Sequence, residues 1–263
     1  MTERIEKIIE QVVAEIRRPY EIQKTSDSAA TDTRSETERK DAQISTSVIT
    51  KKMVAGTIDH TLLRPEATHK DIMRLCAEAD HYGFAAVCIN PIWIKTCSER
   101  LLHSDVSVCS VIGFPLGANT TCLKVEETKR AVADGATEID MVLNIGKFKS
   151  GDLVFAHEDI CRVVQAAQPA HVKVIIEACL LSDEEKVAAC VIAQQAGVHF
   201  VKTSTGFSRG GATTKDVALM RRVVGQGIGV KAAGGIRDYL TAVAMLNAGA
   251  NRLGTSASVA IVS

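Results

Sequence analysis

Short apolar runs alternate with amphipathic stretches of about helix length from residue 53 to the end of the chain. The runs are rich in Val and Ile, which is typical of the buried strands of a parallel sheet whose strands are joined by helices. We therefore predict eight strands, at residues 54–60, 84–90, 106–114, 137–144, 172–178, 198–204, 228–234 and 251–256.

Eight strands and their helices within about 210 residues fit a closed (β/α)8 TIM barrel. The alternative is an open, doubly wound sheet, in which a G-x-G-x-x-G motif after the first strand would indicate dinucleotide binding. No such motif follows the first predicted strand. The pattern therefore favours an α/β barrel domain over residues 53–263.

The N-terminal part of the chain has two other patterns. Residues 1–18 carry six apolar side chains at helical spacing, with charged residues over most of the remaining surface. Residues 19–52 are dominated by Ser, Thr, Asp, Glu and Lys, which offer too little apolar area to offset the entropy of ordering. We predict an amphipathic helix over 1–18 and a flexible polar linker over 19–52. The six apolar residues are Ile5, Ile8, Ile9, Val12, Val13 and Ile16.

Charge and composition narrow the choice of partners and compartment. The 31 basic and 31 acidic side chains give a formal net charge of zero, which argues against broad nucleic-acid binding. There is no apolar stretch of the length that crosses a bilayer and no secretion signal at the start. The eight cysteines contain no C-x-x-C pair, which favours reduced thiols in the cytoplasm over a disulfide or zinc framework.

Charged residues within the predicted strands are the candidates for chemistry. In a barrel, side chains at the carboxyl ends of the strands converge on one face. A lysine is rarely buried without a partner, so each residue could instead point to solvent or belong to an ion pair. These residues are Asp59, Asp140, Lys173, Glu177, Lys202 and Lys231.

Lys202 and Lys231 lie at equivalent ends of adjacent predicted strands. Lys202 shares its strand face with the apolar Val198 and Phe200. Desolvation and a neighbouring ammonium group both lower the pKa of a lysine, and an uncharged amine can attack an aldehyde to form an imine. Asp140 could then shuttle protons. Lys173 is the competing candidate for the nucleophile.

Glycine-rich turns follow the last three predicted strands, at residues 204–212, 233–237 and 254–258. Barrels often bind phosphate through the loops after strands seven and eight, because small residues let backbone N–H groups approach the oxygens. A single Gly-Gly pair is more often a plain turn, but three such segments close to two lysines favour a phosphate site.

Six segments in order resemble the deoxyribose-phosphate aldolase family of class I aldolases: IDHTLL (58–63), VIGFPLG (111–117), EIDMVLN (138–144), KVIIEACLL (173–181), VKTSTGF (201–207) and VKAAGGIR (230–237). The resemblance implies cleavage of 2-deoxyribose 5-phosphate to acetaldehyde and glyceraldehyde 3-phosphate without a cofactor. It implies that Lys202 is the Schiff-base lysine, that Lys231 lowers its pKa and that Asp140 relays protons. It also suggests a homodimer. The residues implied to bind substrate are Asp59, Gly206, Gly234, Gly235, Arg237, Gly254 and Ser256.

Two departures from this family affect the expected activity. Many relatives resemble GTSSG at the last strand, whereas this chain has Ala257 in place of the second serine, which removes one hydroxyl donor to phosphate. The chain ends at Ser263, without the tyrosine-bearing tail that some relatives use for proton transfer. We expect slower enamine formation from the second departure.

Several other interpretations remain at this stage. The seven histidines show no spacing that gathers three metal ligands, so we predict no metal site. Residues 1–18 resemble the encapsulation peptides that bind shell proteins of bacterial microcompartments, although such a helix could equally pack on its own barrel or self-associate. The alternatives to the predicted activity are another Schiff-base phosphosugar aldolase, a transaldolase-like barrel, and a noncatalytic shell-associated protein that binds a phosphorylated metabolite.

Overall fold

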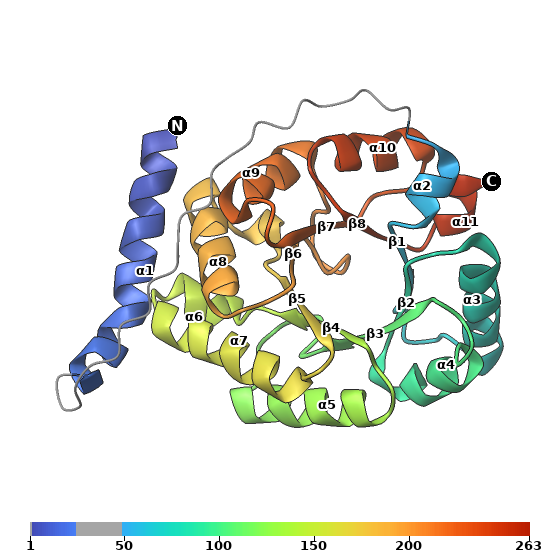
Figure 1. Cartoon of the computed structure of the whole chain (residues 1–263), viewed down its shortest axis with the longest axis horizontal. Helices are drawn as coiled ribbons and strands as arrows, with labels where there is room; N and C mark the ends of the chain where they lie inside the picture. The colour runs from blue at the N-terminus through green and yellow to red at the C-terminus, as the bar shows by residue number, and fades with distance from the viewer. Residues whose placement is uncertain (1, 25–48) are drawn as a thin grey trace.

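The computed structural model describes residues 2–24 and 49–263. Its centre is a closed barrel of eight parallel strands that neighbour one another in sequence order (Figure 1). The chain thus has the predicted TIM-barrel fold. The strands are β1 (Ile58–Leu62), β2 (Ala86–Ile89), β3 (Ser107–Ile112), β4 (Glu138–Val142), β5 (His171–Ile175), β6 (Phe200–Lys202), β7 (Gly229–Ala233) and β8 (Arg252–Thr255).

Helices surround the barrel and begin where the sequence provides caps. Thr68 and Ser182 each form a capping box, in which the cap hydroxyl accepts from the third helical N–H and an acidic side chain accepts from the cap N–H. The helices are α2 (Lys51–Ala55), α3 (His69–Tyr82), α4 (Ile94–Arg100), α5 (Thr121–Ala133), α6 (Ile145–Lys149), α7 (Leu153–Ala167), α8 (Asp183–Gln195), α9 (Thr214–Val224), α10 (Tyr239–Asn247) and α11 (Ser258–Val262), with short 3₁₀ turns at η1 (Pro91–Trp93) and η2 (Ala178–Leu180).

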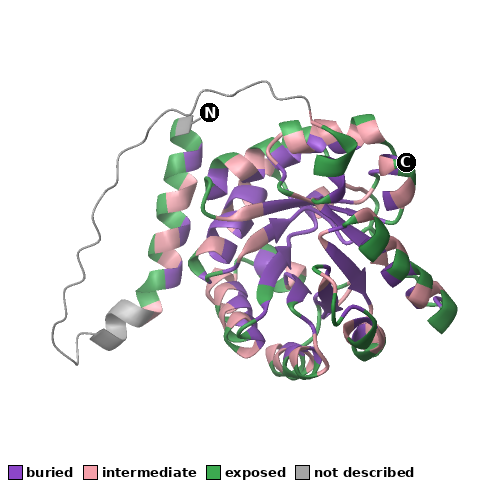
Figure 2. Cartoon of the chain, turned by 45° about the vertical axis from the view of Figure 1, so that its right-hand side comes forward, coloured by how far each residue is buried: buried purple, intermediate pink, exposed green. Residues whose placement is uncertain are grey.

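Most strand residues are buried (Figure 2). The two faces of the strands differ in chemistry. Side chains such as Ile139 and Val174 belong to the main apolar core, which also contains residues of the surrounding helices. A small second cluster, which includes Cys88 and Cys109, fills part of the barrel interior. The remaining interior positions are charged, and these charged groups form the floor of the site described below.

All eight strands are shorter in the structure than predicted, and two of them differ from the prediction by more than two residues at one end. Residues 51–55 form α2, which Thr50 caps by accepting from the N–H of Met53, so β1 begins at Ile58 rather than at residue 54. Strand β5 ends at Ile175, and Glu177 therefore lies in the following turn. Local capping and turn formation override the apolar pattern at both places.

The N-terminal helix α1 (Thr2–Lys24) runs beyond the predicted end at residue 18, through Pro19. Its apolar stripe faces the barrel domain, with Ile5, Val12 and Ile16 buried in the main core (Figures 1 and 2). The helix packs on α8 and α7. The structure therefore shows the intramolecular packing that the sequence left as an alternative. The central part of the predicted linker, residues 25–48, lies outside the described residues, whereas its last residues belong to the barrel domain.

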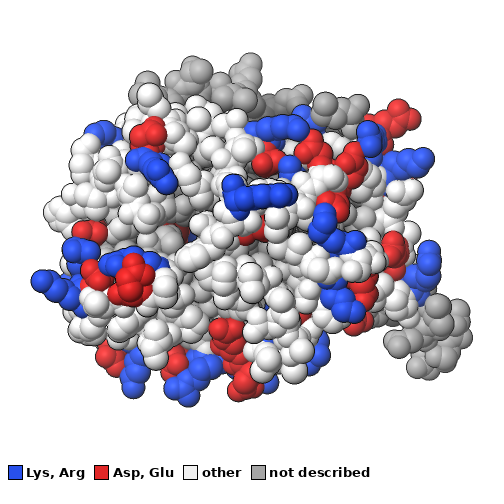
Figure 3. All heavy atoms as spheres, turned by 180° about the vertical axis from the view of Figure 1, so that it is seen from behind, with Lys and Arg blue, Asp and Glu red and all other residues white. Residues whose placement is uncertain are grey.

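The surface carries no strong charge bias on the face seen in Figure 3. Basic and acidic side chains are interspersed there among larger areas of uncharged surface. This agrees with the zero formal net charge of the whole chain. Within the described ranges, none of the helices combines the length and the apolar character that a membrane span requires.

Candidate active site

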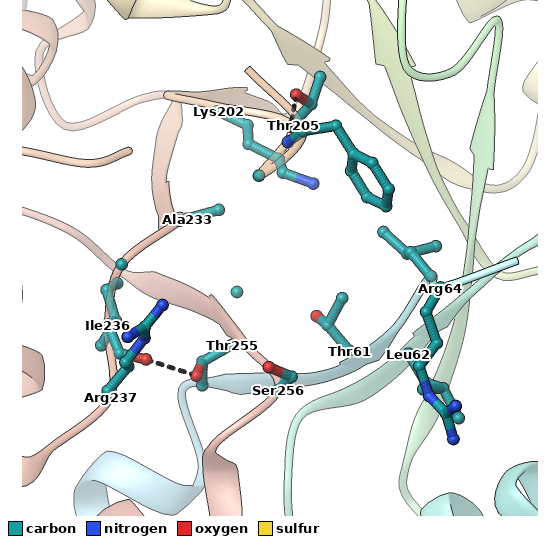
Figure 4. A pocket seen from close by; sticks show the side chains of 16 residues that line it. Thr61, Leu62, Arg64, Lys202, Thr205, Ala233, Ile236, Arg237, Thr255 and Ser256 are labelled. Atoms are coloured by element: carbon teal, nitrogen blue, oxygen red, sulfur yellow. Dashed lines mark hydrogen bonds between the residues drawn. The ribbon is translucent and has the colours of Figure 1, made fainter. Parts of the chain in front are cut away.

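A pocket of about 310 Å³ opens at the carboxyl ends of the strands. Lys202 is the one lysine on its wall, and Figure 4 shows its amino group directed into the space. Strands β1, β6, β7 and β8 and the turns that follow them supply the wall. The wall residues are Thr61, Leu62, Leu63, Arg64, Lys202, Thr205, Gly206, Phe207, Ala233, Gly234, Gly235, Ile236, Arg237, Gly254, Thr255 and Ser256.

The two predicted lysines lie on the same side of the barrel wall. Parallel pairing aligns Lys202 on β6 with Lys231 on β7, so both side chains enter the interior. Each donates to the same oxygen, Oδ2 of Asp140, at 2.7 Å. Lys202 is only 2% exposed, whereas Lys231 is fully buried and does not reach the pocket wall. The geometry therefore unites the three predicted catalytic residues, with Lys202 uppermost.

Asp140 is the common acceptor of this group. Its second oxygen, Oδ1, accepts from Lys173 at 2.9 Å. Burial alone would raise the pKa of Asp140, but Lys173, Lys202 and Lys231 outweigh it and hold that pKa well below its usual value. Asp140 is therefore ionised at neutral pH.

Lys231 remains charged because it lies next to two carboxylates. Burial opposes its charge, but Asp140 and Asp59 raise its pKa above the ordinary lysine value. Lys231 contacts both carboxylates, whereas Lys202 pairs with Asp140 alone among the residues that the structure describes. Lys231 can therefore continue to compensate Asp140 when Lys202 is uncharged.

A deeper layer of ion pairs supports this group. Asp59, which the family resemblance placed among the substrate-binding residues, is fully buried and does not line the pocket. It accepts from Lys231 and, at 2.7 Å, from Arg252. Lys173 is also fully buried and pairs with Glu138 at 2.5 Å. Lys173 thus belongs to an ion-pair network, as its alternative interpretation predicted. Asp59 forms its ion pairs below the pocket and not on the pocket wall.

Sequence reasoning missed Glu138 and Arg252, although the strand period could have identified both. Glu138 lies two residues before Asp140 on β4, and Arg252 lies two residues before Gly254 on β8, so each shares a face with a residue that was singled out. Arg252 bridges Asp59 and Glu138 and lies over the ring of Phe200.

The interior charges do not cancel when every group is ionised. Three carboxylates face four cationic side chains, so an uncharged Lys202 would leave the network balanced. The carboxylates are those of Asp59, Glu138 and Asp140, and the cations are Lys173, Lys202, Lys231 and Arg252.

Two groups of cysteine and carboxylate donors in this interior have the spacing of a metal site, one around Cys88, Cys109 and Asp140 and the other around Asp59, Cys109 and Glu138. Lysine ammonium groups already contact these donors. Lys173 Nζ, for example, lies 3.3 Å from Cys109 Sγ and 2.9 Å from Asp140 Oδ1. The lysine ammonium groups therefore already occupy the donors that a metal ion would need.

The glycine turns meet on the pocket wall as predicted. Gly206, Gly234 and Gly235 adopt positive φ angles, which glycine tolerates best. In the part of the chain that the structure describes, the backbone N–H groups of Gly206, Gly235 and Ser256 donate to no protein acceptor. Unpaired amides of this kind are typical of anion sites.

Two further predicted residues complete this side of the pocket. A Cβ at Gly254 would lie 3.1 Å from Cε of Lys231, so the missing side chain leaves room for that lysine. Arg237 is exposed and lies beside Ile236 at the edge of the pocket, across from Arg64 (Figure 4). The ion pairs of the described residues include Arg64 but not Arg237. Arg237 is therefore free to meet an anionic ligand.

A lysine amine on the wall of a barrel pocket, next to an ionised carboxylate, is suited to the imine chemistry of a class I aldolase. Comparison with known proteins agrees. The chain belongs to the DeoC/LacD family of aldolases, whose model matches residues 53–261. Helix α1 lies outside this match.

Individual relatives of the chain are aldolases of the same kind. A deoxyribose-phosphate aldolase from Bacillus cytotoxicus is 59% identical over 80% of this chain and 94% of its own length. The corresponding protein from Brevibacillus brevis is 58% identical over 78% of this chain and 93% of its own. Among solved structures, the tetrameric deoxyribose phosphate aldolase from Aeropyrum pernix superposes with a TM-score of 0.76 at 35% identity, covering 81% of this chain and 91% of that one.

The buried position of Asp59 predicts a pH-dependent stability effect. Burial raises the pKa of Asp59, but the charges of Lys231, Lys173 and Arg252 together lower it by a larger amount. The pKa in the folded state therefore lies below the pKa in the unfolded state. The carboxylate therefore stabilises the fold above about pH 4 and loses this effect as the pH falls toward the folded pKa. Asp59→Asn should cost about 3–5 kcal/mol at pH 7, because it leaves buried cations undercompensated.

Urea unfolding of the wild type and of Asp59→Asn between pH 3 and pH 7 measures this effect. The difference in free energy of unfolding should shrink below about pH 4. The exposed Asp105→Asn serves as the matched control and should change stability little at any pH. A difference between Asp59→Asn and the wild type that stays constant over the whole range would contradict the ion-pair assignment.

Proposed function

We propose that this protein is a class I aldolase that reversibly cleaves 2-deoxy-D-ribose 5-phosphate to acetaldehyde and D-glyceraldehyde 3-phosphate. The observation that carries the proposal is the position of Lys202. Its amine faces a pocket that also presents unpaired backbone amides, and it is bonded to Asp140. The names of the curated relatives support this choice of substrate.

Binding would place the two ends of the substrate on opposite parts of the pocket. The phosphate would accept from the amides of Gly206, Gly235 and Ser256 and pair with Arg237. Gly234 and Gly254 let the backbone come close to the ligand. The aldehyde carbon of the open-chain sugar would then lie at the Lys202 amine.

Covalent chemistry would begin when the uncharged amine of Lys202 attacks the aldehyde carbon. Asp140 lies 2.7 Å from Lys202 Nζ, so it can carry one proton from the attacking nitrogen to the oxygen of the carbinolamine. A second proton, taken up from solvent through the open pocket, lets this hydroxyl depart as water. The resulting iminium withdraws electrons from the C2–C3 bond. Lys231 shares the same Asp140 oxygen and keeps the carboxylate compensated throughout.

Bond cleavage would follow from the iminium. The C3 hydroxyl passes its proton to the carboxylate of Asp140 and becomes the aldehyde of glyceraldehyde 3-phosphate, while the C2–C3 electron pair forms an enamine on Lys202. Asp140 can then return this proton to C2. Protonation of the enamine at C2 and addition of water to the iminium release acetaldehyde and restore the free amine.

Reductive trapping tests this proposal. Incubation with acetaldehyde and borohydride should attach an ethyl group to Lys202 and abolish cleavage of 2-deoxyribose 5-phosphate, because the reduced imine cannot be hydrolysed. Peptide mass spectrometry locates the label. Lys202→Met should give neither label nor turnover. A label confined to Lys173 or Lys231, or turnover that survives in Lys202→Met, would refute the assignment, and a panel of phosphosugars would reveal another substrate.

A second part of the proposal concerns location in the cell. We propose that α1 directs the protein to the shell of a cytoplasmic bacterial microcompartment. The amphipathic stripe and the position of α1 outside the family match support this role. Because Ile5, Val12 and Ile16 are buried against the barrel domain, the helix must leave this face before a shell protein can bind the stripe.

Fluorescence microscopy tests the targeting role. Residues 1–24 fused to a fluorescent carrier should concentrate in shells, whereas the same fusion with Val12→Glu and Ile16→Glu should stay diffuse, because the apolar stripe is lost. Diffuse fluorescence of the unaltered fusion in shell-forming cells would remove the proposal. For the whole chain we propose a homodimer, which light scattering of the purified protein measures directly.

A further inference from the structure

Glu177 is a buried carboxylate that the proposed reaction does not use. It lies between β5 and η2, its side chain is almost inaccessible to solvent, and it does not line the pocket. It is also the one residue other than glycine, among those described, with a positive φ, at 50°. Such a backbone conformation costs free energy in any residue with a Cβ and persists only when other contacts compensate for it.

The compensating contacts lead mainly to the turn after β6, and one further contact comes from Cys179, whose Sγ lies 3.8 Å from Glu177 Oε1. The carboxylate of Glu177 accepts from the backbone N–H of Thr205 at 3.2 and 3.4 Å and also from the Thr205 hydroxyl. Next to this contact, the N–H of Ala178 donates to the carbonyl of Thr203 at 2.8 Å. The turn after β5 therefore holds the turn after β6 through both side-chain and backbone bonds.

These contacts determine which amide of the β6 turn is available to a ligand. The N–H of Thr205 is used by Glu177, and the N–H of Phe207 donates to the Thr205 hydroxyl at 3.1 Å. The N–H of Gly206, which lies between them, has no acceptor within the described ranges of the chain. Thr205, Gly206 and Phe207 all line the pocket. The carboxylate thus leaves one unpaired amide on this side of the pocket wall.

Hydrogen bonding, rather than charge pairing, explains the choice of a carboxylate at this position. The ion pairs found among the described residues do not include Glu177. A carboxylate is a strong double acceptor, and hydrogen bonds to an ionised group are stronger than those to a neutral one. Glycine would adopt the positive φ without strain, so the turn by itself does not call for glutamate.

We propose that Glu177 is a positioning residue for the substrate phosphate. It holds Thr205 so that the Gly206 amide is offered to the phosphate, and it thereby sets the preference for phosphorylated over unphosphorylated substrate. Its carboxylate acts through Thr205 and leaves the amine chemistry at Lys202 unaffected. The inference rests on the proposed function, since it concerns the phosphate end of the same pocket.

Steady-state kinetics of the full-length Glu177→Gly enzyme test the proposal. The variant removes the carboxylate and also relieves the backbone strain. We expect the KM for 2-deoxyribose 5-phosphate to rise about tenfold, which corresponds to the loss of one good hydrogen bond to the anion. The kcat/KM for unphosphorylated 2-deoxyribose should change much less. Glu177→Gln, which keeps the shape and one acceptor oxygen, should recover most of the phosphate preference.

Two controls separate this proposal from a general loss of structure. Thr205→Val removes the hydroxyl partner without touching Glu177 and should weaken phosphate affinity in the same direction, so it serves if Glu177→Gly does not fold. Glu158→Gln changes an exposed carboxylate and should alter no parameter. An equal loss on the phosphorylated and unphosphorylated substrates, or an unchanged KM in both Glu177→Gly and Thr205→Val, would overturn the proposal.

Calorimetry with inorganic phosphate distinguishes this inference from the proposed function. Wild type should bind phosphate more tightly than Glu177→Gly, whichever sugar the enzyme cleaves. Reductive labelling of Lys202 by acetaldehyde should be the same in both proteins. Failure of the labelling in wild type would count against the proposed function alone, whereas equal phosphate affinity in the two proteins would count against the role of Glu177 alone.

Discussion

The structure depends above all on the Asp140 carboxylate, which is fully buried and contacts three lysine ammonium groups. A buried charge is costly unless it is paired and hydrogen-bonded, and removal of one partner leaves the others uncompensated. The lysines come from β5, β6 and β7, so only a closed barrel brings them to one carboxylate. Barrel closure and the electrostatics of the site are therefore a single constraint.

Two layers of the barrel interior have different roles. The lower layer, which contains Asp59, Glu138 and Arg252, is closed, and its charges are paired with one another. The upper layer is a pocket whose glycine turns leave backbone amides unpaired. Lys202 is the residue that belongs to both, since it contacts Asp140 below and reaches the pocket above. A reactive amine can thus be exposed to substrate while its surroundings remain rigid.

Helix α1 shows how the apolar face of an amphipathic segment can be buried without a partner protein. Its stripe packs on α8 and α7, and burial of a side chain such as Ile16 contributes roughly 1.5–3 kcal/mol. Arg4 and Glu184 form an ion pair at its edge, but both are exposed, so this pair adds little. Any partner that binds the stripe must compete with this intramolecular packing.

The sequence alone determined the barrel, its eight strands and the interior direction of Lys202 and Lys231, because strand period and apolar runs are local properties. The alternation of side chains between the two faces of a strand would also have identified Glu138 and Arg252. Tertiary structure alone decided that Asp59 lies below the pocket, bound to a lysine 172 residues away, and that Glu177 leaves β5 to hold Thr205. These contacts depend on strand register around the closed barrel and on turn conformations, which no local pattern of residues specifies.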